Sequence, residues 1–206
     1  MTEGAEHAEH VHKDREAAKI GMWLFLFTEM LLFGGLFILY SAYRSRYPGD
    51  FHRGGQQLDY VIGVVNTLIL LTSSLTMATS LTALAQRQRR RAVFLLTTTV
   101  LLGAVFLVNK SFEWSVKFHH GIYPSSPELL ARPPGEILFF GLYFTMTGLH
   151  GLHVVAGIAV LSVMTFLVAR GRITAADPVK LVNAGLYWHL IDVIWIFLLP
   201  LFYLAA

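Results

Sequence analysis

Five long apolar segments constrain the fold of this chain more than any other feature. They run over about 19–43, 58–85, 92–116, 136–169 and 181–204, and most charged residues lie between them. A helix of about 20 apolar residues crosses a bilayer, so each segment is long enough to span one. In lipid, a single segment satisfies its own backbone groups only as a helix. The sequence therefore predicts an all-α integral membrane bundle of five transmembrane helices over residues 19–206, preceded by a polar cytoplasmic tail over 1–18.

The composition narrows the class of protein further. Charged residues make up 14% of the 206-residue chain, against about 25% in soluble domains. The absence of cysteine excludes disulfides, thiolate metal sites and a cysteine nucleophile. The net charge of +3 comes mainly from arginines in short loops, so it reports membrane topology and not nucleic-acid binding. The histidines at 7, 10 and 12 lack a fixed frame for a metal ion.

The loops predict the orientation of the chain. With the N-terminus inside, the inner segments hold ten Lys and Arg residues and the outer segments hold five. Because cytoplasmic loops are enriched in Lys and Arg, we expect the N-terminus to be cytoplasmic and the C-terminus to be periplasmic. The short turn over 86–91 makes the second and third helices antiparallel neighbours. The outer loop over 117–135 contains four prolines, so it cannot be helical for long.

Two histidine-bearing stretches lie inside the fourth and fifth segments. His150 and His153 are three residues apart and share one helix face, and the glycines at 148, 151 and 157 allow another helix to approach closely. His189 and Asp192 are also three apart. Ionisable groups at this depth must face protein or water. The four side chains have the donor types of a metal site, but hydrogen bonds between two helices would satisfy them without an ion.

Glu29 lies near the middle of the first segment, among Trp, Leu, Phe and Met residues. An ionised carboxylate without a partner at that depth costs at least about 2.5–3.5 kcal/mol. We therefore expect Glu29 to be buried, protonated and hydrogen-bonded to a neighbouring helix, with His150, His153 or His189 as its partner. Such a carboxyl group is suited either to handling a proton or to fixing the packing of two helices, and the residues alone favour neither role.

Further polar residues lie within the second and third segments. Lys110 and Glu113 are three apart near the outer end of the third segment, where a paired lysine that extends toward the interface is expected. Asn66 is expected to make an interhelical hydrogen bond. No catalytic residue and no metal ligand is predicted. The predicted buried polar network consists of Glu29, Asn66, Glu113, His150, His153, His189 and Asp192.

Three tryptophans are candidates for contacts at the outer surface of the bundle. Trp23 lies in the first segment, and Trp188 and Trp195 lie in the fifth. Tryptophan concentrates at membrane interfaces, but Trp188 and Trp195 are placed well inside their span. We therefore expect these side chains to line a surface for lipid tails or for a partner helix.

Several of these stretches resemble one known family, subunit III of the haem–copper oxidases. Gly148-Leu-His-Gly-Leu-His-Val is similar to the family signature Gly-x-His-Gly-x-His-Val. Tyr187-Trp-His-Leu-Ile-Asp-Val-Ile-Trp is similar to Tyr-Trp-His-Phe-Val-Asp-Val-Val-Trp. The segment around Glu29 resembles the one whose buried carboxylate reacts with carbodiimide. Weaker matches at Asn66-Thr67 and Phe112-Glu113-Trp114 extend the resemblance over roughly residues 19–205.

The resemblance implies a function that the residues alone do not show. It implies a fold like cytochrome c oxidase subunit III, in the five-helix bacterial form, without the lipid-filled cleft made by the first two helices of seven-helix relatives. The chain would be a non-catalytic subunit of a proton-translocating cytochrome c or quinol oxidase in the bacterial inner membrane. It would pack on catalytic subunit I, near subunit II and phospholipids. Haem and copper would lie in those partners, and this chain would support proton uptake and the stability of the complex.

Alternatives remain open at this point. Five-helix relatives also accompany nitric oxide reductases. A membrane metalloprotein using His150, His153, His189 and Asp192 is a different class of function, and a small proton or ion transporter centred on Glu29 is a third. Absence of an inverted repeat argues against the transporter. Metal analysis of the isolated chain and co-purification with a haem-bearing partner would distinguish an accessory oxidase subunit from a metalloprotein.

Overall fold

The computed structural model describes the backbone of residues 2–204 and the side chains of residues 16–204. The tail histidines at 7, 10 and 12 therefore lie outside the described side chains. The described chain is helical, and its one β pairing is an isolated bridge between Thr174 and Asp177. The helices are α1 (Thr2–Arg46), α2 (Pro48–Gly55), α3 (Tyr60–Ala85), α4 (Arg89–His119), α5 (Pro127–Leu130), α6 (Pro134–Ala169) and α7 (Val179–Leu199), followed by the π-helical turn η1 (Pro200–Leu204).

Five of these helices, within the described residues, are long and apolar enough to cross a membrane. They are Glu16–Arg46 of α1, then α3, α4 and α6, and the continuous stretch Val179–Leu204. The predicted five-span bundle is confirmed. Helix α1 begins at Thr2, so it runs through the stretch that the sequence analysis treats as a tail. The boundary at residue 18 remains a prediction.

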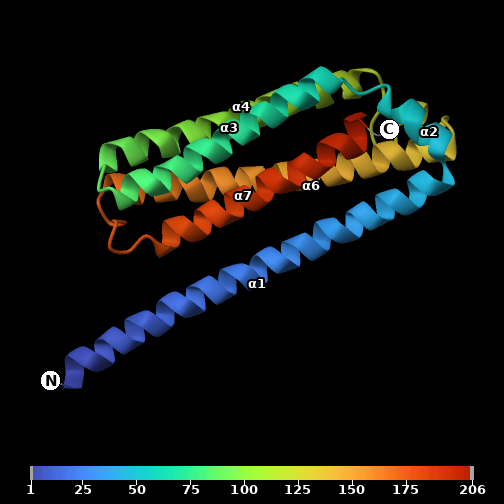
Figure 1. Ribbon diagram of the computed structural model, residues 1–206. Helices are drawn as coiled ribbons and strands as arrows, with labels where there is room; N and C mark the ends of the chain where they lie inside the picture. The colour runs from blue at the N-terminus through green and yellow to red at the C-terminus, as the bar shows by residue number, and fades with distance from the viewer. Residues whose placement is uncertain (1, 205–206) are drawn as a thin grey trace.

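The helices form a core with one peripheral member (Figure 1). Helices α3 and α4 pack side by side as the predicted antiparallel hairpin, and α6 and α7 pack against them. Helix α1 lies outside this group and contacts α6 and α7. Only 11% of the apolar window of α1 is buried inside the chain, against 50% for the α7 span. The surface of α1 is therefore left largely to lipid or to another protein.

Local sequence signals explain where the helices begin and end. The Asp59 carboxylate accepts hydrogen bonds from the backbone N–H groups of Val61 and Ile62 at the start of α3, which caps that helix. Helix α6 ends at Ala169, and Gly171, two residues later, has a φ of +71°, the left-handed conformation common after a helix. The turn after α3 places Arg87 at φ +59°, where glycine is more usual.

The segments α2 and α5 close one end of the bundle. Arg53 donates to Glu136 at the start of α6 over 3.0 Å, and this hydrogen bond raises the pKa of the Arg53 guanidinium above its usual value. Arg132 donates to Glu136 and to Gln57. Within the proline-rich loop the one helical piece is the four-residue α5, which agrees with the expectation that this loop is not helical for long. These bonds make it an ordered cap.

The expectation for Trp188 and Trp195 is wrong, because both are fully buried within the bundle. Trp188 fits between Gly103 of α4 and Gly157 of α6, where an added Cβ atom would lie 2.7 and 2.8 Å from its ring. Each indole N–H donates to a hydroxyl group on α3, Trp188 to Ser73 and Trp195 to Thr67. A large aromatic side chain with a satisfied N–H belongs in such a core. These two tryptophans therefore do not contact lipid.

Candidate functional site

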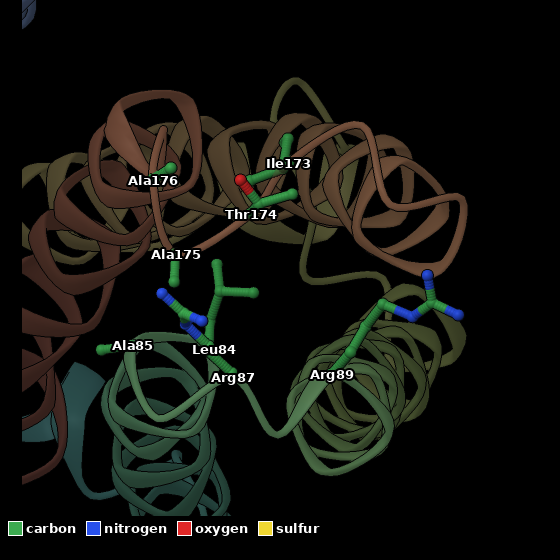
Figure 2. Close-up of a pocket in the computed structure, with 8 residues that line it drawn as sticks. All are labelled: Leu84, Ala85, Arg87, Arg89, Ile173, Thr174, Ala175 and Ala176. Carbon is green, nitrogen blue, oxygen red and sulfur yellow. The ribbon is translucent and has the colours of Figure 1, made fainter.

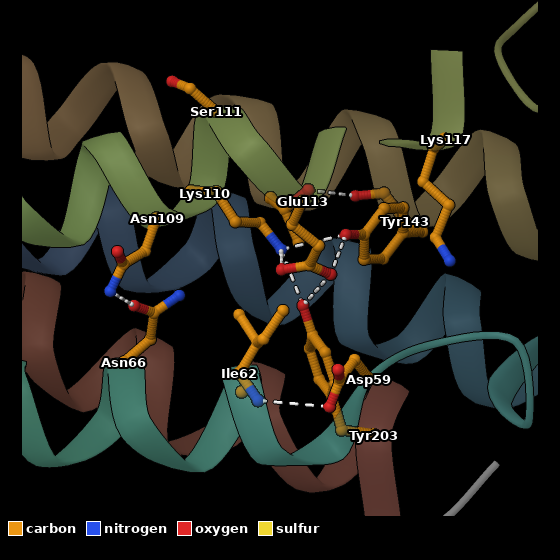
Figure 3. Close-up of polar contacts among 12 residues, drawn as sticks. Asp59, Ile62, Asn66, Asn109, Lys110, Ser111, Glu113, Lys117, Tyr143 and Tyr203 are labelled. Atoms are coloured by element: carbon orange, nitrogen blue, oxygen red, sulfur yellow. Dashed lines mark hydrogen bonds and ion pairs between the residues drawn. The ribbon is translucent and has the colours of Figure 1, made fainter. Parts of the chain in front are cut away.

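A closed polar cluster lies between α4, α6 and η1 (Figure 3). The Lys110 ammonium group donates to Glu113 Oε2 at 3.1 Å, to Tyr143 Oη at 2.9 Å and to Tyr203 Oη at 2.6 Å. Both tyrosine hydroxyls donate to Glu113 Oε1, at 2.5 and 2.6 Å. All three donors of the lysine are therefore used. The ammonium also lies 5.3 Å from the Trp195 ring centroid, within cation–π range.

The position of Lys110 corrects the expectation that it extends to the interface. It is paired with Glu113, as predicted, but the pair is buried inside the bundle, with 6% and 4% of the two side chains exposed. The hydroxyl groups of Tyr143 and Tyr203 supply the polar surroundings that water would supply at an interface. A buried ion pair of this kind is tolerated when further hydrogen bonds satisfy the remaining donors and acceptors.

Glu29 and His153 form a second polar contact, between α1 and α6. His153 Nε2 lies 2.9 Å from Glu29 Oε2, so one of the three histidines expected as a partner for Glu29 is the partner. The Glu29 side chain is largely buried, because only 15% of each side chain in the pair is exposed on the isolated chain. The protonation state expected for Glu29 stays a prediction. The ring of Phe33 packs edge-on against His153 and shields one side.

The hydrogen bonds of His153 restrict the protonation of this pair. Its Nδ1 atom lies 2.8 Å from the Leu149 carbonyl oxygen, which can only accept, so Nδ1 carries a proton. His153 Nε2 and the Glu29 carboxyl group then share one further proton between them. Either a protonated carboxyl donates to a neutral imidazole, or an imidazolium donates to a carboxylate. The pair carries no net charge in both arrangements.

His150 has a different environment from His153, although they share a helix face. It is fully buried, and its ring packs 5.2 Å from Trp195 and 5.6 Å from Phe106, measured between centroids. Neither ring nitrogen has a hydrogen-bond partner among the described residues. His150 therefore takes no part in the predicted network and acts as an aromatic member of the core.

The glycines around the two histidines also separate into different roles. Gly157 faces Trp188, and an added Cβ atom at Gly148 would lie 3.1 Å from Trp114. At Gly151 nothing lies within 4 Å of that position. Close approach of another helix is thus confirmed for Gly148 and Gly157, whereas for Gly151, which lies on an open side of α6, it stays a prediction.

His189 and Asp192 do not complete a metal site with the other histidines. His189 Nδ1 shares a hydrogen bond of 2.7 Å with Ser74 on α3, and it lies 4.0 Å from Asp192 Oδ2. Asp192 is buried without a hydrogen-bond partner in the described chain, so the expected mutual satisfaction of these groups is incomplete. In the part of the chain whose side chains are described, no three His, Cys, Asp or Glu side chains are placed to hold one metal ion.

Three residues of these polar clusters were not predicted from the sequence. Asn109 donates to buried Asn66 at 3.1 Å, which confirms the expected interhelical hydrogen bond but adds an unexpected partner. Tyr143 and Tyr203 complete the Lys110 cluster. A signal existed for Tyr143, because it precedes His150 by seven residues and so shares its helix face. No comparable signal existed for Tyr203, which lies in a π-helical turn.

Comparison with known proteins decides the family. The sequence matches the family model for cytochrome c oxidase subunit III over residues 1–206. The chain belongs to the cytochrome c oxidase subunit III family. It is 30% identical to the cytochrome bo(3) ubiquinol oxidase subunit 3 of Pseudomonas putida, over 95% of this chain and 89% of that protein. It is 32% identical to the cytochrome c oxidase subunit 3 of Synechocystis, over 98% of this chain and 81% of that protein.

The subunit III signatures have a clear structural place in this fold. The signature at 148–154 lies on α6, where it carries His150 into the core and His153 toward Glu29 of α1. The signature at 187–195 lies on α7, where Trp188 and Trp195 fill the space between α3, α4 and α6. The family match over the whole chain agrees with a membrane protein of five apolar spanning helices.

Proposed function

We propose that this chain is the accessory subunit III of a respiratory haem–copper terminal oxidase in a bacterial inner membrane. The observation that carries the proposal is the family match over the whole chain. Relatives named as subunit 3 occur in both cytochrome bo(3) ubiquinol oxidases and cytochrome c oxidases. The internal chemistry supports an accessory role, because the polar clusters bond mainly to themselves and tie helices together.

The proposed partners are the catalytic subunit I and subunit II, which would hold the haem and copper. His189 supports a protein partner. Its side chain is 35% exposed in the middle of α7, and its Nε2 atom has no hydrogen-bond partner within the described chain. In contrast, exposed Thr72, Thr79 and Thr97 each donate to a carbonyl of their own helix, which suits them to lipid. An imidazole nitrogen without a partner in lipid is costly, so a protein group is expected to cover it.

The proposed orientation has the N-terminus in the cytoplasm and the C-terminus in the periplasm. The basic residues support it, because the α3–α4 turn and the α6–α7 loop lie at one end of the bundle (Figure 1). These two connections hold seven of the sixteen Lys and Arg residues. Reporter fusions within the α3–α4 turn are expected to show a cytoplasmic position. A periplasmic reporter signal from that turn would contradict the orientation.

Phospholipids are further proposed neighbours of this subunit. An apolar groove of about 500 Å³ lies where α1 approaches α6 and α7, lined by Met22, Phe25, Val160, Met164 and Tyr187, with Lys180 at its edge. An acyl chain fits such a lining. The exposed side chain of Trp23 on α1, with 64% of its surface accessible, remains a candidate for contact with lipid or with a partner.

A deletion experiment tests the proposed function. The oxidase is purified from cells with and without this chain, through a tag on its haem-bearing subunit. We expect the chain to co-purify with subunits I and II. Without it, the haem spectrum should be unchanged, while oxygen consumption should decay faster during sustained turnover. Failure to co-purify with a haem-bearing partner would refute the proposal.

The metalloprotein alternative is not favoured, because His150, His153, His189 and Asp192 have separate surroundings.

A further inference from the structure

A pocket of about 510 Å³ opens between the α3–α4 turn and the α6–α7 loop (Figure 2). It lies where α3 and α6 end and where α4 and α7 begin, which is the depth of lipid headgroups in any bundle of these spans. Its volume falls within the range of small-molecule sites. The lining residues are Leu84, Ala85, Arg87, Arg89, Ile173, Thr174, Ala175 and Ala176.

The lining combines two cations with small apolar side chains. Figure 2 shows the Arg87 side chain extending toward Ala175, with Arg89 on the other side of the pocket. An added Cβ atom at Gly171 would lie 3.0 Å from Arg89 Nη1, so this guanidinium rests against the backbone of the α6–α7 loop. The Thr174 hydroxyl is the remaining polar side chain of the lining. The pocket therefore has two cationic groups and an otherwise mainly apolar lining.

Neither guanidinium in the pocket has a carboxylate partner among the residues that the structure describes. At the opposite end of the bundle, Arg53 and Arg132 are both paired with Glu136. Two guanidinium groups beside one pocket, without an internal anion, favour an external one. Arginine is well suited to phosphate, because its planar fork donates two parallel hydrogen bonds.

The backbone at Arg87 is a second and independent observation. Its φ of +59° is in the left-handed region, which side chains other than Asn and Asp rarely adopt. The residue stands just after α3, at the position where a helix usually ends in glycine. An arginine is unfavourable there for the fold alone. A strained residue that lines a pocket suggests a role for its side chain.

We propose that this pocket binds the phosphate headgroup of an anionic phospholipid, with Arg87 and Arg89 contacting the phosphate. The small apolar residues of the loop would contact the glycerol and the first methylene groups. Basic pockets at the cytoplasmic ends of transmembrane helices suit such headgroups. The site would hold the α6–α7 loop against the α3–α4 turn. The inference rests on the proposed membrane placement and not on the identity of the catalytic partner.

The test uses the purified complex in nanodiscs of phosphatidylcholine, with or without phosphatidylglycerol. Native mass spectrometry counts the retained lipids and the subunits. We expect the wild type to retain one phosphatidylglycerol at this chain. The double variant Arg87→Gln/Arg89→Gln should lower that retention about tenfold or more. The matched control Arg90→Gln/Arg91→Gln removes the same charge from the same turn, outside the pocket, and should retain the lipid like the wild type.

A single variant separates binding from folding. Arg87→Gly removes one guanidinium and places glycine where the positive φ suits it. It should raise the unfolding temperature and lower phosphatidylglycerol retention. A purely structural role for Arg87 would move the unfolding temperature and leave lipid retention unchanged.

Four outcomes would overturn the proposal. The first is no preference of the wild type for phosphatidylglycerol, and the second is an equal loss of lipid in both double variants. The third is displacement of the lipid by inorganic phosphate at the same concentration, which would assign the pocket to a free anion. The fourth is loss of another subunit from the Arg87→Gln/Arg89→Gln complex, which would assign it to a protein contact. Because subunits and lipids are counted separately, absence of the oxidase partners would refute the proposed function without deciding this site.

Discussion

The Lys110 cluster and the Glu29–His153 pair satisfy buried polar groups in opposite ways. The cluster joins α4, α6 and η1 through five hydrogen bonds, and it leaves no donor of Lys110 unused. The pair joins α1 to α6 through a single contact of 2.9 Å, and it is partly open to the surroundings. The difference indicates a rigid core to which α1 is attached at few points.

Side-chain packing differs between the core and α1 in the same way as the polar contacts do. Trp188 is enclosed between glycines of α4 and α6, whereas Gly34 and Gly35 of α1 have nothing within 4 Å of an added Cβ atom. We therefore expect changes in the core to affect the stability of the chain itself. Changes in α1 should mainly affect how it associates with its partners or with lipid.

The largest effect is expected from breaking the buried ion pair. Lys110→Met leaves the Glu113 carboxylate without its cation, and removing one partner of a buried pair costs about 3–5 kcal/mol. The measurement is the free energy of unfolding in detergent. The control is the double variant Lys110→Met/Glu113→Gln, which removes both charges and should recover more than half of the loss. A single variant as stable as the double variant would contradict a charged pair.

A smaller effect is expected from Gly157→Ala. The new methyl group meets the Trp188 ring 2.8 Å away, and a ring held on both sides cannot move aside, so we expect a loss of about 3 kcal/mol. The matched control in α1 is Gly34→Ala, which meets no atom and should be neutral or slightly stabilising. Thermal unfolding of both variants compares the two regions directly. Equal losses would show that α1 is packed as tightly as the core.

A moderate effect is expected at Glu29. Glu29→Ala removes the hydrogen-bond partner of His153, which should cost about 1–2 kcal/mol. Glu29→Gln should stay close to the wild type if the carboxyl is neutral, because the amide N–H can donate to Nε2 in its place. Unfolding free energies and the yield of assembled complex are the measurements. If Glu29→Gln is as damaging as Glu29→Ala, the pair is an imidazolium and a carboxylate.

The smallest effect on the chain is expected from Trp23→Leu on the exposed face of α1. The isolated chain should lose no more than about 0.5 kcal/mol, as for most surface changes. The second measurement is the yield of complex that co-purifies with the haem-bearing subunit. A normal yield of complex would assign Trp23 to lipid, whereas a reduced yield would assign it to a partner subunit.

The spans and the signature positions could be predicted from the sequence because their causes are local. Length and apolarity decide whether a segment crosses a bilayer, and three-residue spacing puts His150 and His153 on one face of α6. The choice of His153 as the partner of Glu29 could only be narrowed to three histidines. The two imidazoles point to different neighbours, since a shared face still covers a wide arc of the helix.

Apolar length and residue spacing along the chain therefore predict the set of helices, their order and the kinds of polar group that must find partners. Which partners they find depends on how the helices pack. Lys110 turns inward because Tyr143 and Tyr203, far apart in the chain, place their hydroxyl groups beside it. Trp188 is buried because Gly103 and Gly157 on two other helices leave space for its ring. Such choices depend on which helices pack together, and the periodicity of a single helix does not contain that information.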